Sequence, residues 1–204
     1  MMKNDKKKIF DDLLFIYKNY VNSNGVIKNC DYPSINSDYI GNCKCRISRE
    51  NYFSDFEELV EKSGYILEMR DGSLISFCYY FDKDDNLDNF EVSFIPYYKS
   101  DMLKNYNLHS ILSKYIRIDY DKTGYSEVIH PLIHMHNNLE RDGLRIPLDS
   151  PVSPSEFLYL IIRYYYNFDW IILKNRISII DNLSIINTLL PNERNLFYLS
   201  VNLK

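Results

Sequence analysis

Apolar positions recur at helical spacing near the start of the chain and again in its last third. Residues 5–21 place apolar side chains three and four positions apart, which predicts an amphipathic helix. The segment Ser153-Pro154-Ser155-Glu156 combines a capping-box pattern with proline at the first helical position, and predicts a helix from there to about Tyr166. That helix is apolar on nearly every side, so we expect it to be buried against a sheet. A shorter helix is predicted at residues 54–64, again from a capping-box pattern. Another short helix is predicted at residues 181–190.

Alternating apolar and polar positions dominate the middle of the chain. The pair Asp71-Gly72, set between two apolar segments, predicts a hairpin of residues 65–70 and 73–81. Further strands are predicted at residues 90–97, 114–120, 125–130, 133–136 and 196–201. The pattern predicts one α+β domain spanning residues 1–204, with a mostly antiparallel sheet, an N-terminal helix and a buried C-terminal helix. Residues 1–60 form a helical and loop region, and residues 115–166 form the core that carries the motifs.

Charge and hydropathy narrow the classes of function. Lys and Arg total 24 and Asp and Glu total 28, a formal net charge of −4, which excludes binding of nucleic acid by the whole surface but not by a local basic patch. We find neither a signal peptide nor an apolar stretch of the ~18 residues that a membrane span needs. We therefore expect a cytoplasmic protein with no membrane partner, whose cysteines are reduced thiols. These are Cys30, Cys43, Cys45 and Cys78.

Histidines are concentrated in one short segment. Three of the 4 histidines in the chain, His130, His134 and His136, fall within it. His134 and His136 are two positions apart in a predicted strand, so both imidazoles project from one face. Such a pair suits two ligands of one metal ion, or an acid and a base acting on one substrate group.

Charged residues upstream extend this candidate site. Arg117, Asp119 and Asp121 share one face of the predicted strand 114–120 and its end, and converge with the imidazoles if the sheet places the two strands side by side. A mixed set of His134, His136 and Asp119 fits Mn, Zn or Fe. Without a metal, the same residues offer general acid–base catalysis.

Two arginines and two further acids complete the candidates. Arg117 and Arg145 are expected to hold a phosphate or an oxyanion. Simpler interpretations stay open: Arg117 and Asp119 as an ion pair, and Asp121 as a turn residue. Glu127 ranks below Asp119 because it is out of phase with His130 in a regular strand.

The order of these residues resembles a known family. The segment Arg117-Ile118-Asp119-Tyr120-Asp121 is followed by His130-Pro131-x-x-His134-x-His136, then by Arg145-Ile146-Pro147 and Pro154-x-x-Phe157. This string resembles an uncharacterised bacterial domain-of-unknown-function family over residues 115–166. The chain departs from the family pattern at Asn137-Asn138, where a glycine usually follows the last histidine.

The motif order is also similar to that of small toxins of bacterial toxin–antitoxin pairs. This resemblance implies a nuclease-like or nucleotide-directed toxin or phage-defence protein that acts on phosphodiester bonds of RNA or of nucleotides. His134, His136, Asp119 and His130 are the catalytic candidates, and an antitoxin or a defence-complex subunit is the expected protein partner.

A second class of function stays open. The chain is then an accessory subunit without catalysis, which docks a larger ATPase or nuclease of a defence complex through exposed aromatic side chains. In that case the histidines are buried and their ring nitrogens are hydrogen-bonded, whereas in an enzyme they face a cleft.

Overall fold

The computed structural model describes residues 5–20, 25–32, 35–42, 47–98, 108–122, 125–126, 130–137 and 145–173. They contain five helices and eight strands, which in chain order are α1 (Asp5–Tyr20), β1 (Ile27–Cys30), β2 (Tyr39–Gly41), α2 (Tyr52–Glu61), β3 (Leu67–Met69), β4 (Leu74–Phe81), β5 (Leu87–Ile95), α3 (Leu108–Leu112), β6 (Ile116–Tyr120), β7 (Ile133–Asn137), β8 (Arg145–Pro147), α4 (Pro154–Tyr165) and α5 (Asn167–Leu173).

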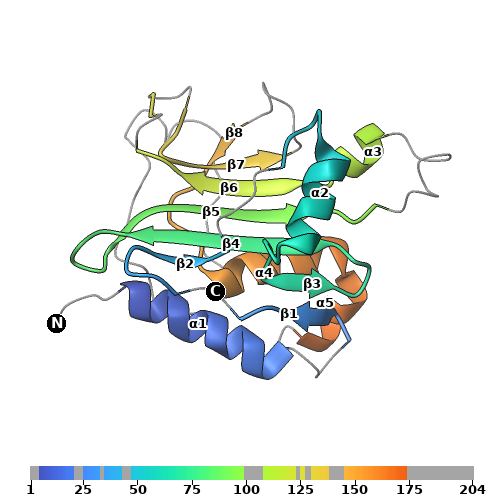
Figure 1. The fold of residues 1–204 in the computed structure, drawn as a ribbon, viewed down its shortest axis with the longest axis horizontal. Coiled ribbons are helices and arrows are strands. Elements are labelled where there is room, and N and C mark those ends of the chain that lie inside the picture. The colour runs from blue at the N-terminus through green and yellow to red at the C-terminus, as the bar shows by residue number, and fades with distance from the viewer. Residues whose placement is uncertain are drawn as a thin grey trace.

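The strands form one sheet in the order β1-β3-β4-β5-β6-β7-β8, and β2 pairs with β4 beside β3 (Figure 1). Every described strand pair is antiparallel. From β3 to β8, neighbours in the sheet are also neighbours in the chain, so the pairings are local. The predicted single α+β domain with a mostly antiparallel sheet is confirmed.

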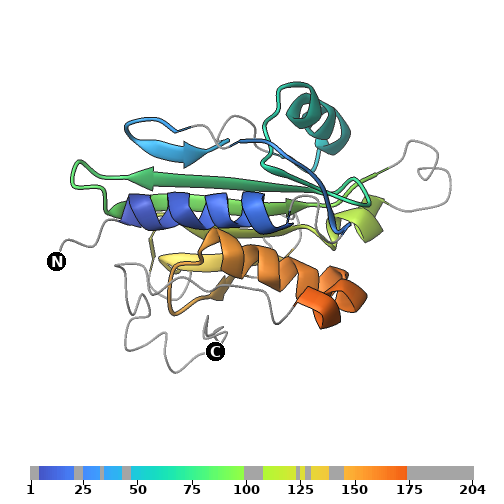
Figure 2. The same ribbon diagram turned by 90° about the horizontal axis from the view of Figure 1, so that it is seen from below.

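The two faces of the sheet differ in polarity. One face packs against α1 and α4, and its buried residues include Phe77 of β4, Phe90 of β5 and Ile118 of β6. On the other face a smaller core forms under α2, which joins Leu59 of the helix and the sheet residues Leu74 and Ile95 in one buried cluster. Figure 2 shows α2 on one side of the sheet and α4 with α5 on the other. The α2 side is where the polar residues of β5, β6 and β7 project.

Three of the predicted elements have the expected local cause. The helix over residues 5–20 buries an apolar stripe, and the hairpin of β3 and β4 turns at Gly72, whose φ of 88° favours glycine. Ser153 caps α4: its hydroxyl accepts a hydrogen bond from the Glu156 N–H, and the Glu156 carboxylate accepts one from the Ser153 N–H.

Other predictions were wrong in detail. The predicted capping box at Ser54 is absent, since α2 begins at Tyr52 after Asn51, and the Ser54 hydroxyl donates to the Asn51 carbonyl from inside the helix. Within the predicted strand 125–130, Ser126 and His130 pair with each other in an isolated antiparallel bridge, and residues 127–129 lie outside the described residues. Helix α5 was not predicted. The predicted elements at 181–190 and 196–201 lie outside the described residues.

The cysteine prediction is corrected in part. Cys30 is a free thiol, whereas Cys78 is disulfide-bonded. The pattern along the chain carries no information about which cysteines the sheet brings together, so the linkage was not foreseen. Cys43 and Cys45 lie outside the described residues. Within the described ranges, no helix has the length and apolar character required to cross a membrane.

Asp12 of α1 makes a buried contact with the first turn of α4. Its carboxylate accepts hydrogen bonds from the Ser155 N–H (2.7 Å) and the Ser155 hydroxyl, and only 5% of Asp12 is exposed. Burial raises the pKa of Asp12 to about 6, although the bonds from Ser155 oppose the shift. The folded state therefore holds a proton that the unfolded chain releases near pH 4.

We expect the free energy of unfolding to fall by about 3 kcal/mol as the pH rises from about 3 to about 7, because the native state binds the Asp12 proton more tightly than the unfolded state does. In Asp12→Asn this part of the decline should disappear, since the amide is neutral at every pH and its NH2 group can donate to the Ser155 hydroxyl. Urea denaturation at several pH values measures both curves. Parallel curves would contradict the assignment.

Candidate functional site

Three adjacent strands bring the predicted site residues together. In the ladder of β6 and β7, Asp119 lies opposite His134 and Arg117 lies opposite His136, and β8 places Arg145 opposite His136. Residues two apart on a strand share a face, so all five side chains project from the polar side of the sheet. The convergence of imidazoles with Arg117 and Asp119 is therefore a property of the structure.

Asp119 is the centre of the group. Its Oδ2 accepts hydrogen bonds from Arg117 Nε (2.9 Å), and Arg117 Nη2 lies 2.8 Å away; His136 Nε2 is 3.1 Å from the same oxygen. Burial alone would raise the pKa of Asp119, but the hydrogen bond with His136 and the charge of Arg117 outweigh it and hold the pKa below its ordinary value. Asp119 is thus a carboxylate at neutral pH, and its Oδ1 is buried without a hydrogen-bond partner among the described residues.

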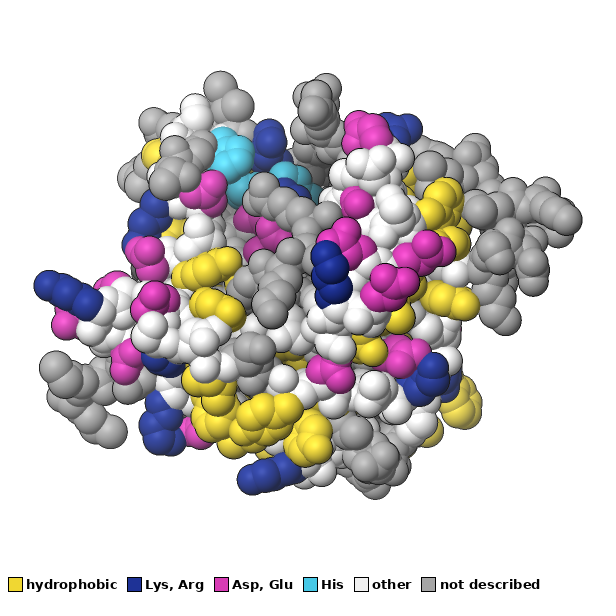
Figure 3. Space-filling model, in the orientation of Figure 1, with side chains coloured by type: hydrophobic (Ala, Val, Ile, Leu, Met, Phe, Trp, Pro, Cys, Tyr) yellow, Lys and Arg dark blue, Asp and Glu magenta, His cyan; other side chains and the backbone are white. Residues whose placement is uncertain are grey.

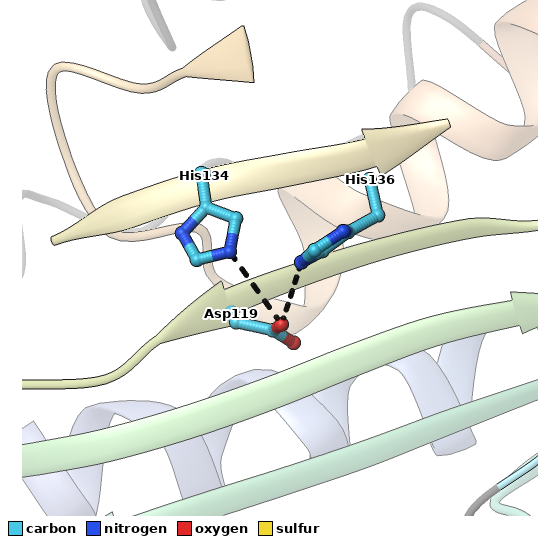
Figure 4. A group of neighbouring side chains, drawn as sticks. All are labelled: Asp119, His134 and His136. Atoms are coloured by element: carbon cyan, nitrogen blue, oxygen red, sulfur yellow. Dashed lines mark ion pairs between the residues drawn. The ribbon is translucent and has the colours of Figure 1, made fainter. Parts of the chain in front are cut away.

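His134 presents a lone pair to this carboxylate. Its Nδ1 lies 2.9 Å from the Pro131 carbonyl oxygen, which only accepts hydrogen bonds, so Nδ1 carries the proton and Nε2 the lone pair. Burial, with 1% of the residue exposed, is the main cause that lowers the pKa of His134 to about 4, so the ring is neutral at pH 7. Nε2 lies 3.8 Å from Asp119 Oδ2 and has no hydrogen-bond partner among the described residues (Figure 4).

His136 lies between a hydrogen-bond acceptor, Asp119, and a donor, Arg117. Its Nε2 is 3.1 Å from Asp119 Oδ2, an acceptor, and 3.1 Å from Arg117 Nη2, a donor. One ring nitrogen holds either a proton or a lone pair, so these two contacts require opposite states of Nε2. The arrangement allows His136 to donate or to accept at this atom.

The three residues also have the spacing of a metal site. One donor atom from each of Asp119, His134 and His136 lies within 4.8 Å of the others, and the described part of the chain holds no second group of this kind. Donors around one Zn²⁺ lie about 3 to 3.5 Å apart, given metal–ligand distances of about 2.0–2.2 Å. The Nε2–Oδ2 distances of 3.1 and 3.8 Å are close to that requirement. The bond from His134 Nδ1 to Pro131 is the support that metal-binding histidines generally have.

The remaining candidates lie at the margin. The His130 ring is 4.6 Å from the His134 ring, centroid to centroid, but His130 is not one of the clustered donors. Arg117 forms the ion pair with Asp119 that the sequence left open. Asp121 follows the end of β6, and its charge acts on His130. Glu127 lies outside the described residues.

Glu91 and Ser93 of β5 lie opposite Asp119 and Arg117 in the ladder, and neither was predicted to belong to the site. Glu91 pairs with Asp119 in the ladder of β5 and β6, and its charge acts on Arg117 and on Tyr115. The available signal was the alternation of β5, where Phe90, Val92 and Phe94 face the apolar core and leave the residues between them on the polar face.

The surface view agrees with this placement. Histidine, basic and acidic side chains gather in one region of the face that Figure 3 shows, which is the side of the sheet that carries α2. Burial increases inward, since His136 is 8% exposed and His134 only 1%, while His130 and Arg145 are half-buried. The two histidines of β7 are therefore the more buried part of the site, and His130 and Arg145 form its more exposed rim.

Replacing Arg117 with Met should lower the free energy of unfolding by about 2–3 kcal/mol, because the Asp119 carboxylate stays buried without its charged donor. Arg145→Met is the matched control: the same change on a neighbouring strand, where the described residues supply no carboxylate partner, should cost less than about 1 kcal/mol. Urea denaturation followed by circular dichroism measures both. Equal losses would show that the Arg117–Asp119 pair does not stabilise the site.

Comparisons with known proteins identify a family and no close homologue of known structure. No curated protein matches the chain, and no solved structure matches it. The sequence profile of one family, described as "Uncharacterized conserved protein (DUF2290)", matches residues 20–201. That range contains every candidate residue of the site and all but the first helix of the fold. The chain belongs to the DUF2290 family of uncharacterised conserved proteins.

Proposed function

We propose that this protein is a hydrolase of phosphodiester bonds in RNA or nucleotides, with its reaction centre at Asp119, His134 and His136. The enzyme works with a divalent metal ion at these residues or, without one, by acid–base chemistry at the same atoms. The cytoplasm is the proposed location.

One observation carries this proposal. The lone pair of His134 Nε2 and the negatively charged Asp119 Oδ2 face each other at 3.8 Å; Nε2 is buried, and no described hydrogen-bond donor serves it. Two electron-rich atoms repel each other in a medium of low polarity, and a buried polar atom without a partner costs free energy. An electrophile between them, either a cation or the proton of a bound hydroxyl group, removes both penalties. A purely structural histidine has no need of this arrangement.

Each residue has a defined part in the chemistry. A bound Zn, Mn or Fe ion would supply a water molecule of lowered pKa and a charge to polarise the phosphoryl group. Arg117 orients Asp119, and Pro131 orients His134. Without the ion, the attacking hydroxyl gives its proton to His134 Nε2 and its oxygen bonds to phosphorus. The bond from phosphorus to the leaving oxygen breaks, and His136 Nε2 donates its proton to that oxygen.

The biological setting follows from the motif order described above. A toxin or phage-defence protein that cleaves RNA or consumes nucleotides would use this chemistry, and an antitoxin or another defence subunit would restrain it. Growth arrest upon expression, relieved by substitution of the site, is the corresponding cellular phenotype.

A second candidate function is a non-catalytic accessory subunit that docks an ATPase or nuclease of a defence complex. It is favoured by an exposed apolar surface at the end of α4 and on α5, where Tyr164 is 66%, Phe168 75% and Ile171 64% exposed. The deep burial of His134 also suits it. In this case the site carries no activity, and the α5 surface is the functional part of the molecule.

Elemental analysis of the purified protein should find about one Zn, Mn or Fe ion per chain, because two imidazoles and one carboxylate form a divalent-metal site. His134→Ala/His136→Ala should lose the ion and keep its circular dichroism spectrum. His109→Ala is the control for loss of one imidazole, since His109 belongs to α3 and not to the clustered strands. Equal metal content in all three proteins would exclude the site.

Hydrolysis of RNA and of nucleotides should fall at least about 100-fold in Asp119→Asn, because loss of even an outer partner of a metal ligand costs 10–100-fold. The amide has the shape of the carboxylate but lacks its charge. Activity is measured by release of nucleotides or phosphate, with Asp12→Asn as a matched control at a carboxylate outside the site. Wild-type activity in Asp119→Asn would remove Asp119 from the reaction centre.

A further inference from the structure

The two arginines flanking the site have different environments. Arg117 of β6, His136 of β7 and Arg145 of β8 lie in one row across the sheet, so His136 is between the two guanidinium groups. Arg117 donates to Asp119 through Nε, with Nη2 2.8 Å from the same oxygen. Its charge is thus matched inside the protein.

Arg145 has no such match. Among the described residues, Arg145 Nε is buried without a hydrogen-bond partner, and no carboxylate forms an ion pair with the guanidinium. Buried guanidinium donors are generally hydrogen-bonded, and a partly buried charge without a counter-charge is costly. An anion from outside the described residues would satisfy both the open donor and the charge.

His130 belongs to the same cluster of side chains as Arg145. The His130 ring packs on His134, the His134 ring lies 4.6 Å from that of His136, and Arg145 lies opposite His136 in the ladder. His130 Nδ1 is also buried and without a hydrogen-bond partner in the described part of the chain. Burial and, after it, the positive charge of Arg145 lower the pKa of His130, while the charge of Asp121 acts in the opposite direction. The bridge to Ser126 holds the His130 backbone, and the ring stacks edge-on against that of His134 at 4.6 Å.

We propose that Arg145 and His130 form a subsite for a phosphoryl group, next to the Asp119–His134–His136 centre. A guanidinium presents a planar fork of N–H donors that matches two phosphate oxygens, and His130 Nδ1 serves a third position. Both residues are half-buried, whereas His134 of the reaction centre is buried.

This assignment divides the work of the two arginines. Arg145 binds the phosphate of the substrate, and Arg117 is a positioning residue for Asp119. The role as a substrate subsite rests on the proposed function, but the binding of phosphate does not, since neither Arg145 nor His130 belongs to the group of metal donors.

The test is titration calorimetry of metal-free protein, prepared with a chelator, using inorganic phosphate and AMP as probes and acetate as the carboxylate comparison. Wild type should bind phosphate and AMP, and acetate at least about 10-fold more weakly, because acetate fills only the guanidinium fork. Arg145→Met should weaken phosphate binding at least about 10-fold, since two charge-assisted hydrogen bonds are lost. Arg145→Lys, which keeps the charge but not the fork, should be intermediate, and His130→Ala should weaken binding as well.

The matched control is Arg163→Met on the exposed face of α4, which removes the same charge from a residue that lies over the Trp170 ring. It should bind phosphate as wild type does. His134→Ala/His136→Ala should also keep phosphate binding, which separates this subsite from the metal centre. Wild-type affinity in folded Arg145→Met, an equal loss in Arg163→Met, or no binding by wild type would each overturn the subsite, whatever the metal analysis shows.

Discussion

The backbone hydrogen bonds between β6 and β7 pair Asp119 with His134 and Arg117 with His136, and the polar face of the sheet depends on this register. A shift by one residue would turn Ile118 and Met135 toward that face and send the charged side chains into the apolar core. The core formed with α1 and α4 opposes such a shift, because Ile118 and Phe90 are buried there. Hydrophobic packing on one face therefore positions the chemistry on the other.

The polar side chains of the site make only part of the hydrogen bonds that their atoms can form. Arg117 donates a hydrogen bond to Asp119 Oδ2, and the Pro131 carbonyl accepts one from His134 Nδ1. These bonds fix the orientation of the Asp119 and His134 side chains. The atoms that face inward, His134 Nε2 and Asp119 Oδ1, are left without partners among the described residues. Buried polar groups are generally hydrogen-bonded, so these unpartnered atoms beside fixed neighbours are the observation on which the proposed binding site rests.

The centre of the site and its rim differ in how the charges of their side chains are balanced. At the centre, negative and positive charges are balanced by Asp119 and Arg117. At the rim, no negative charge of the described residues is paired with Arg145, and neither Arg145 Nε nor His130 Nδ1 has a described hydrogen-bond partner. A net charge of −4 for the whole chain does not oppose the proposed binding of an anion at the rim. An anion responds to the groups within a few ångströms, and distant charges are screened by salt.

The sequence alone determined which residues share a face within each element. Period-two alternation placed His134 with His136 and Arg117 with Asp119, and the capping pattern at Ser153 located the start of α4. Only the tertiary structure decided which strands are neighbours and in which register, since pairing depends on hydrogen bonds and packing between distant segments. For that reason Glu91 was missed, the roles of Arg117 and Arg145 could not be told apart, and the disulfide of Cys78 was not foreseen.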